Sequence, residues 1–217
     1  MDLTQFSPSS ALVTVVLLAL APYAAVMLSS FTKIVVVLSL LRNALGLQQV
    51  PPNVVLNGLA LVLSVYVMYP VGQQMAERTA GVKDPTGSTA NLVAAADAAK
   101  EPLRAFLIQH SLPRERAFFL KTAQKSLPAE QAAAISENDF IVVVPAFTVS
   151  ELTVAFQIGF LIFLPFLVID LIVSNILMAM GMMMLSPTTV SLPLKLLLFV
   201  LIDGWVKLTH GLVLTYP

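Results

Sequence analysis

The sequence contains no cysteine, and only 11% of its 217 residues are charged, with 12 lysines and arginines against 12 aspartates and glutamates. Without cysteine there is no disulfide framework, no thiol nucleophile and no soft-metal site. The lack of a basic excess argues against nucleic-acid binding, which needs a concentrated lysine and arginine footprint. Apolar residues, in contrast, make up 58% of the chain. A soluble domain of this length could not bury so many, which excludes an ordinary cytosolic enzyme and a disordered tail and indicates a membrane protein.

The few charges are concentrated in the middle of the sequence. Eight of the twelve basic and eight of the twelve acidic residues lie between positions 72 and 150. We therefore predict an N-terminal apolar helical half over 1–71 with two membrane-type segments, a polar helical domain over 72–147, and a C-terminal apolar helical hairpin over 148–217. The predicted fold class is an all-α membrane protein, in which helical hairpins from the two apolar halves surround a small helical extracytoplasmic domain.

The first apolar half contains two candidate membrane helices. One has its apolar centre at Ala11–Met27, which is near the lower length limit for crossing a bilayer. The other is Val54–Val71, which we expect to end at Pro70 and Gly72 because proline removes a backbone hydrogen bond.

The second half predicts helices with recognisable starts. Thr148-Val149-Ser150-Glu151 fits the capping-box pattern of a helix start. We expect two helices after it, joined near Gly181–Leu192, the last one running over about Pro193–Leu214. In the polar domain, Pro102 and Pro113 each predict the first residue of a helix, where a missing amide costs little.

Basic residues beside the first short connector predict the orientation in the membrane. Lys33 and Arg42 flank the connector that ends at Asn53, whereas the N-terminal tail carries only Asp2. The positive-inside rule then places this connector in the cytoplasm, with the polar domain and both termini on the far side.

Residues that could carry catalysis or hold a cofactor are scarce. Zinc-protease, nucleophile-elbow and phosphate-loop motifs are all missing from the sequence. His110 and His210 lie far apart without carboxylates at ligand spacing. Asp170 and Asp203 could serve aspartyl chemistry only if they shared one site, and Asp203 already has Lys207 one turn on. We therefore expect no enzyme, no metal and no cofactor.

The charges within the apolar halves are the informative ones, because an unpaired charge facing lipid is costly. Lys195, Asp203 and Lys207 have the spacing of residues on one helix face. They could form a polar helix seam between helices or subunits. Two alternatives stay open, a local Asp203–Lys207 pair and lysines that extend to the membrane surface. Lys195 needs an acidic partner, and Glu151 is the nearest candidate by segment.

Methionines form the second unusual feature. Five of them crowd beside Gly181, immediately before the Ser186-Pro187 step: Met178, Met180, Met182, Met183 and Met184. Three consecutive methionines point in three directions around a helix, so they cannot all enter one core. They could form a soft apolar collar in a connector, or they could simply fill core gaps.

Several uncommon motifs occur in order along both apolar halves. They are Ser30-Phe31-Thr32-Lys33, LLRNALG over 40–46, Pro51-Pro52-Asn53, VPAF over 144–147, SEL over 150–152, FQIGF over 156–160, GMMMLSP over 181–187, SLPLKLLLFVL over 191–201 and DGW over 203–205. In these motifs the sequence closely resembles the FliP/SctR (YscR) family, the export-gate membrane proteins of type III secretion systems. The polar middle carries little of this resemblance.

The resemblance implies a non-enzymatic core subunit of the export gate in the bacterial inner membrane, with the polar domain in the periplasm. The implied partners are copies of the chain in a pentamer, SctS/FliQ-like and SctT/FliR-like subunits, other export-apparatus and basal-body proteins, secreted unfolded substrates and membrane lipid, with no nucleic acid. The resemblance also implies a pore gasket formed by Met182, Met183 and Met184, and an inter-subunit ion pair between Glu151 and Lys195.

Departures from the flagellar pattern favour an injectisome over a flagellum. The sequence starts with Met1-Asp2 where flagellar relatives often begin with a cleavable signal sequence, and Thr153 follows the SEL motif where they often carry a basic residue. Two other functions stay open, an autonomous small-solute transporter or channel and a purely structural membrane scaffold. The two halves show no internal echo of the inverted repeats of many transporters.

Overall fold

The computed structural model describes residues 15, 19–20, 22–23, 25–81, 89–182 and 184–216. Across them the regular elements are all helices, which confirms the predicted all-α class. In order they are α2 (Phe31–Ala44), α3 (Asn53–Ala80), α4 (Thr89–Gln109), α5 (Pro113–Ser126), α6 (Ala129–Ala134), α7 (Phe140–Ala179), α8 (Pro187–Leu201) and α9 (Gly204–Val213). Most of the expected Ala11–Met27 segment lies outside the described residues.

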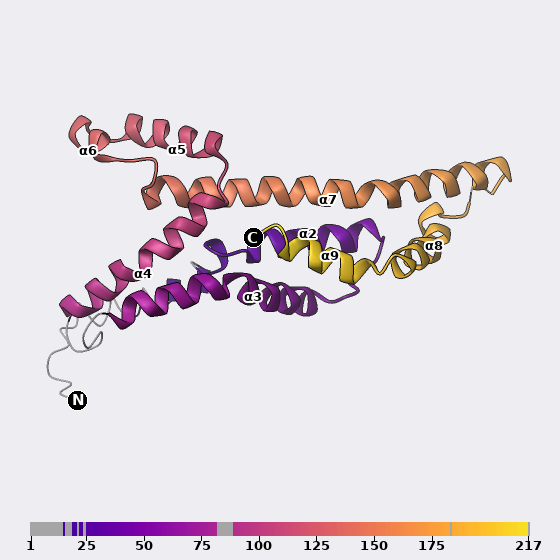
Figure 1. Cartoon of the computed structure of the whole chain (residues 1–217). Helices are drawn as coiled ribbons and strands as arrows, with labels where there is room; N and C mark the ends of the chain where they lie inside the picture. Colours follow the sequence, from indigo (N-terminus) through magenta and orange to yellow (C-terminus); the bar gives the residue numbers. More distant parts are fainter. Residues whose placement is uncertain are drawn as a thin grey trace.

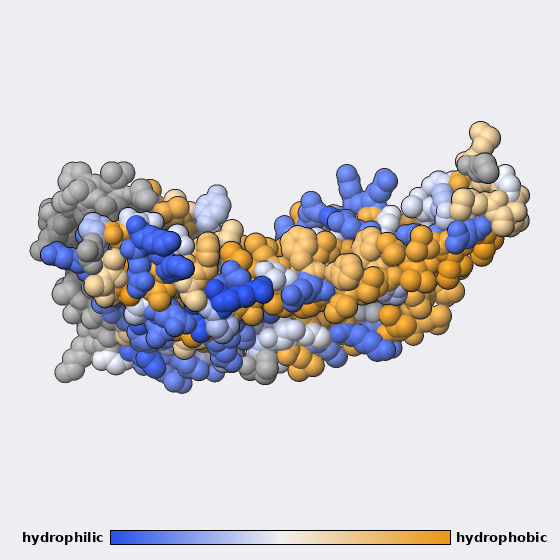
Figure 2. Space-filling view, turned by 90° about the horizontal axis from the view of Figure 1, so that it is seen from above, coloured by the Kyte–Doolittle hydropathy of each residue, from blue (hydrophilic) through white to orange (hydrophobic). Residues whose placement is uncertain are grey.

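The long helix α7 runs along most of the elongated molecule, and α2, α4, α5 and α8 pack on it (Figure 1). The helix α2 packs along the middle of α7, α3 packs on α2 and on α4, and α8 packs near the turn that follows α7. The helix α9 lies beside α2. The helices α4, α5 and α6 gather at the opposite end, where hydrophilic side chains also collect, whereas the part toward the α7–α8 turn is mainly hydrophobic (Figure 2).

The core forms along the helix α2. Its buried apolar residues Ile34, Val37, Leu38 and Leu41 recur every three or four positions, the spacing of one helix face. This face packs against α3, α7 and α9. The helices α2 and α7 approach closely at Gly159, where a Cβ atom would collide with the side chain of Leu40. The close fit of α2 on α7 therefore depends on a residue without a side chain.

Two of the described helices are long and apolar enough to cross a membrane, α3 and α7. The helices α8 and α9 pass the same test only as a pair, bent by 61° at the break between them. The described part of the chain is therefore a membrane protein with two candidate spans, or three if the bent pair counts as one.

Two predicted helix boundaries are wrong. The helix α3 does not end at Pro70 but continues to Ala80, because good helix formers follow the proline and one lost hydrogen bond does not outweigh them. The helix α4 likewise begins at Thr89, so Pro102 lies in its interior. In contrast, Pro113 is the first residue of α5, as predicted.

The second half also differs from the prediction at both ends. The capping box at Thr148 does not start a helix: α7 begins at Phe140, and the Thr148 hydroxyl donates to the Val144 carbonyl inside it. The last helix is not continuous, because the chain breaks at Asp203, whose φ of 53° is left-handed. The prediction of two helices joined near Gly181–Leu192 is confirmed, since α7 ends at Ala179 and a second helix follows, but that helix, α8, begins at Pro187 and not at about Pro193.

Candidate functional site

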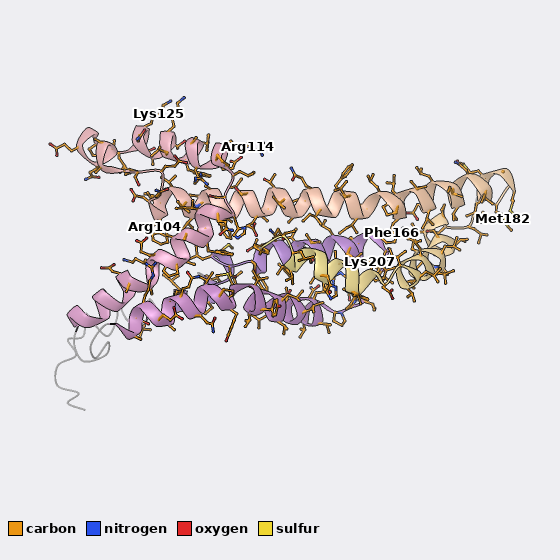
Figure 3. The ribbon with its side chains drawn as sticks, viewed as in Figure 1. Arg104, Arg114, Lys125, Phe166, Met182 and Lys207 are labelled. Atoms are coloured by element: carbon orange, nitrogen blue, oxygen red, sulfur yellow. The ribbon has the colours of Figure 1, made fainter. Side chains whose placement is uncertain are left out.

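The methionine-rich loop lies at the tip of the α7–α8 hairpin, at the far end of the molecule from α5 (Figure 3). The loop reverses direction at Gly181, whose φ of 71° is left-handed and costs glycine little. The exposed fractions are 64% for Met180, 43% for Met182 and 101% for Met184. Met183 lies outside the described residues. The described methionines of this loop are therefore not used to fill the core of their own chain.

Glu151 and Lys33 form a buried ion pair between α7 and α2. The Lys33 Nζ lies 3.2 Å from the Glu151 Oε1. The Lys33 side chain is 3% exposed and the Glu151 side chain 2%. The sequence pattern indicated Lys33 only as a marker of orientation. Within one chain Glu151 thus has a partner other than Lys195. An inter-subunit pair between Glu151 and Lys195 stays a prediction, since it concerns contacts between copies.

Lys195 is the centre of a second polar cluster, which joins α8 to α7 and α2. Its Nζ lies 2.6 Å from the Asp170 Oδ2 and donates to the Ala44 carbonyl at 3.2 Å. The Ser191 hydroxyl donates to the other oxygen of Asp170 at 2.6 Å. Because Ala44 ends α2, the lysine charge also lies at the negative end of that helix dipole.

The sequence itself contains a signal for the pairing of Asp170 with Lys195, although Glu151 was the predicted partner of Lys195. Asp170 is the only charge in the long apolar run after Glu151, so it needs a partner. Asp170 and Lys195 are equally far in sequence from the centre of the loop at 182–183. A hairpin that turns near Gly181 therefore places them opposite each other on its two helices.

The expected seam of Lys195, Asp203 and Lys207 does not lie on one helix. Lys195 is buried in α8, whereas Asp203 is exposed in the break between α8 and α9. Lys207 is exposed on α9 and lines an apolar groove of about 400 Å³ between α2, α7, α8 and α9. A role for Asp203 and Lys207 in contacts between subunits stays a prediction, although its single-helix premise is wrong.

His110 and Tyr216 lie together beside the Lys33–Glu151 pair, with their ring centroids 4.9 Å apart. Burial, and next the positive charge of Lys33, lower the pKa of His110 to about 4. Burial, and next the negative charge of Glu151, raise the pKa of Tyr216. Both side chains are therefore neutral at pH 7. Within the described ranges no three His, Asp or Glu side chains gather as a metal site.

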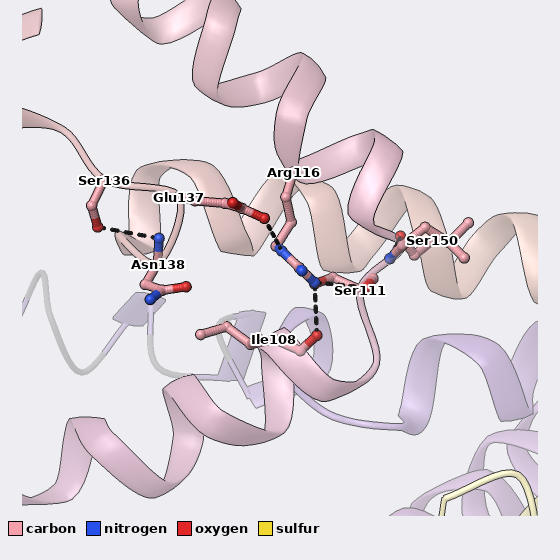
Figure 4. Close-up of polar contacts among 8 residues, drawn as sticks. Ile108, Ser111, Arg116, Ser136, Glu137, Asn138 and Ser150 are labelled. Atoms are coloured by element: carbon pink, nitrogen blue, oxygen red, sulfur yellow. Dashed lines mark hydrogen bonds and ion pairs between the residues drawn. The ribbon is translucent and has the colours of Figure 1, made fainter.

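Arg116 of α5 joins the end of α4 to the segment that precedes α7 (Figure 4). Its guanidinium donates to the Ile108 carbonyl, to the carbonyl and hydroxyl of Ser111, and to Glu137, at 2.9 to 3.0 Å. The backbone amide of Leu112, the residue after Ser111, donates to the Ser150 hydroxyl of α7 at 2.8 Å. The Arg116 bonds hold the α4–α5 corner together, and the Leu112 bond fixes that corner on α7.

A family model described as the FliP family matches residues 13–212. The chain belongs to the FliP family. This confirms the resemblance carried by the motifs of the two apolar halves. The FliP-family assignment also makes the chain a component of a transport apparatus and not an enzyme, as expected from its lack of catalytic motifs.

Members with curated descriptions are similar over nearly their whole length. "Hypersensitivity response secretion protein HrcR" of Ralstonia nicotianae is 51% identical over 210 residues, which cover 96% of this chain and 97% of the relative. "Yop proteins translocation protein R" of Yersinia pestis is 52% identical over 200 residues, 92% of each. "Pathogenicity-related ORF2" of Xanthomonas campestris pv. glycines is 53% identical over 205 residues, 94% of this chain and 95% of the relative.

Proposed function

We propose that this chain is a core subunit of a type III secretion export gate, of the injectisome type. With copies of itself and small partner subunits, it forms a gated channel for unfolded protein substrates across the bacterial inner membrane. Two findings support the assignment to a type III secretion system: membership of the FliP family, and relatives in Ralstonia and Yersinia that are named for secretion and translocation. The observation that carries the gate role is the exposed methionine loop at the hairpin tip.

The proposed gate is closed by the methionine loop. A turn that presents uncovered thioether side chains gives a soft apolar surface, which several copies can press together into a seal. Such a surface can also adapt to substrates of different sequence as they pass. We assign the gasket role to Met182, Met183 and Met184.

The proposed assembly follows from the uncovered apolar surface of the chain. The groove at Lys207 and the exposed apolar faces of α3 and α7 offer contact area for copies of the chain, for SctS/FliQ-like and SctT/FliR-like subunits and for lipid. We propose a pentamer, joined by an inter-subunit pair of Glu151 with Lys195 that forms beside or in place of the contacts within each chain. The division at 72 and 147, with a periplasmic middle domain, belongs to the same proposal.

The gate is tested by conductance of the assembled, closed complex in a planar bilayer. Replacing Met182, Met183 and Met184 together by alanine should raise the ion leak severalfold, because the smaller side chains no longer meet across the pore. The matched control is Met27→Ala, since Met27 is 47% exposed but lies before α2.

Unchanged conductance in the triple variant would contradict the gasket. Specific solute flux through the reconstituted single chain would instead favour an autonomous transporter. Normal assembly without any crosslink between a secreted substrate and the methionine loop would favour a structural scaffold.

A further inference from the structure

The buried Lys33–Glu151 pair is completed by a third side chain from a distant part of the sequence. Tyr216 follows the end of α9, and its hydroxyl donates to the Glu151 Oε2. The other carboxylate oxygen accepts from Lys33. Because an unfilled lone pair on a buried carboxylate is costly, the tyrosine hydroxyl stabilises the charged form of Glu151 within the protein.

The same tyrosine also contacts the positive partner of the pair. The Lys33 Nζ lies 3.6 Å from the centroid of the Tyr216 ring, which is a cation–π contact. One residue thus serves both ions, the carboxylate through its hydroxyl and the ammonium through its ring face. An aliphatic side chain could do neither.

The Tyr216 ring also touches the last turn of α4 and the residue after it. Its centroid lies 6.0 Å from that of Phe106, in a stacked arrangement, and 4.9 Å from that of His110, edge to face. Phe106 in turn contacts Phe147 of α7, with centroids 5.8 Å apart. This aromatic cluster lies next to the α4–α5 corner that Arg116 fixes.

We propose that Tyr216 is a clasp, a positioning residue that couples the α8–α9 end of the chain to the polar domain through the Lys33–Glu151 pair. The clasp joins four segments that are far apart in the sequence: α2, the end of α4, α7 and the residues after α9. A displacement of α9 then cannot occur without exposing the ion pair and loosening the end of α4. The clasp stands on contacts within one chain and does not depend on the export function.

Hydrogen exchange of the full chain in detergent tests the clasp, read by mass spectrometry at the peptide spanning 103–112. Tyr216→Leu removes the ring and the hydroxyl and should speed exchange of that peptide by roughly tenfold. Tyr216→Phe keeps the ring contacts and should have a smaller effect at the same peptide. The matched control is Tyr66→Phe, because Tyr66 is 68% exposed on α3.

The pattern of exchange decides the outcome. The clasp is supported if exchange is faster at 103–112 and around Lys33. Exchange in α5 and in the last turns of α3, over 73–80, should then be unchanged. Unchanged exchange at 103–112 in Tyr216→Leu overturns it. A uniform rise in all helices also overturns it, because that result describes a general loss of stability. If Tyr216→Leu does not fold, the local rise in Tyr216→Phe is the deciding measurement.

Discussion

At the scale of single residues, the buried charges of this chain are stabilised in groups of three or more. Lys33 and Glu151 share Tyr216. In the pair of Asp170 with Lys195, the Ser191 hydroxyl also donates to Asp170, and Lys195 also donates to the Ala44 carbonyl. A buried ion pair is stable only if the remaining lone pairs and protons also find partners, because the desolvation of both ions must be offset. The third polar group in each cluster meets this requirement.

The pH dependence of stability should report the position of His110. Its pKa lies near 4 in the folded chain against 6.5 in an exposed histidine. As the pH falls from about 6.5 to about 4, the unfolded chain therefore takes up a proton that the folded chain does not. Stability should decrease over this window and stay unaffected by His110 above it.

The measurement is the thermal midpoint of the detergent-solubilised chain between pH 7.5 and 4.5, for the wild type and for His110→Gln. Glutamine does not titrate, so the midpoint of the variant should fall less steeply with decreasing pH. Equal slopes for the two proteins would show that His110 is accessible to protons in the folded state.

The sequence could predict which residues need partners but not every partner. The scarcity of charge in the apolar halves makes Glu151 and Lys195 conspicuous in the sequence itself. Glu151 contacts Lys33, however, because α2 packs along α7 in a register that depends on Gly159 and Leu40. Such a register is a property of the packed pair of helices, which neither segment displays alone.

At the scale of helices, prolines are poor predictors of helix ends in this chain. The helices α3, α4, α7 and α8 all continue through at least one internal proline. In apolar surroundings a helix that ends would leave several backbone groups without partners, whereas an internal proline costs about one hydrogen bond. The sequence therefore predicts the apolar helices more reliably than their limits.

The break between α8 and α9 has no proline and depends on a contact. The ring of Phe199 lies against the backbone at Gly204, where a Cβ atom would collide with it, and Trp205 packs edge to face on the same ring with centroids 5.5 Å apart. The bend of 61° places these groups together. This contact between residues on either side of the bend could not be read from helical periodicity.

Gly204→Ala should destabilise the chain by about 1–3 kcal/mol, because the added methyl group forces the buried Phe199 ring away. Gly211→Ala on the same helix is the control, since nothing lies within 4 Å of its Cβ position. The control should change stability by no more than about 1 kcal/mol, in the stabilising direction. Chemical unfolding in detergent measures both. Equal effects of the two substitutions would contradict the account of the bend.

At the scale of the whole molecule, the polar and apolar parts are separated along its length. The helix α5 carries exposed charges such as Lys125 at one end, and the connector between α2 and α3 lies toward the other (Figures 1 and 3). The composition predicts this polarity, because the charges are gathered in one block of sequence. The folded position of that block could not be predicted, because Arg116 holds its corner in part through the backbone carbonyls of Ile108 and Ser111, which leave no signal in the sequence.

The orientation can be measured cleanly because the chain has no cysteine of its own. In a chain placed in the bacterial inner membrane, Lys125→Cys should react with a membrane-impermeant maleimide in spheroplasts. Gln48→Cys, in the connector between α2 and α3 that follows Arg42, should react only in inverted vesicles. Labelling of both cysteines from the same side would contradict the periplasmic placement of the polar domain. The cysteine-free chain is the control for background labelling.

The 40 residues of α7 have a consequence for the depth of the methionine loop. At a rise of about 1.5 Å per residue the helix is about 60 Å long, twice the roughly 30 Å of bilayer hydrocarbon. Glu151 and Asp170 lie about 28 Å apart along it, so the charge-free stretch between them matches that thickness. A bilayer placed between these two residues would leave the last turns of α7, and with them the methionine loop, clear of the acyl chains. In the proposed gate, lipid then could not help to close the pore, and water would be excluded there only where protein side chains meet.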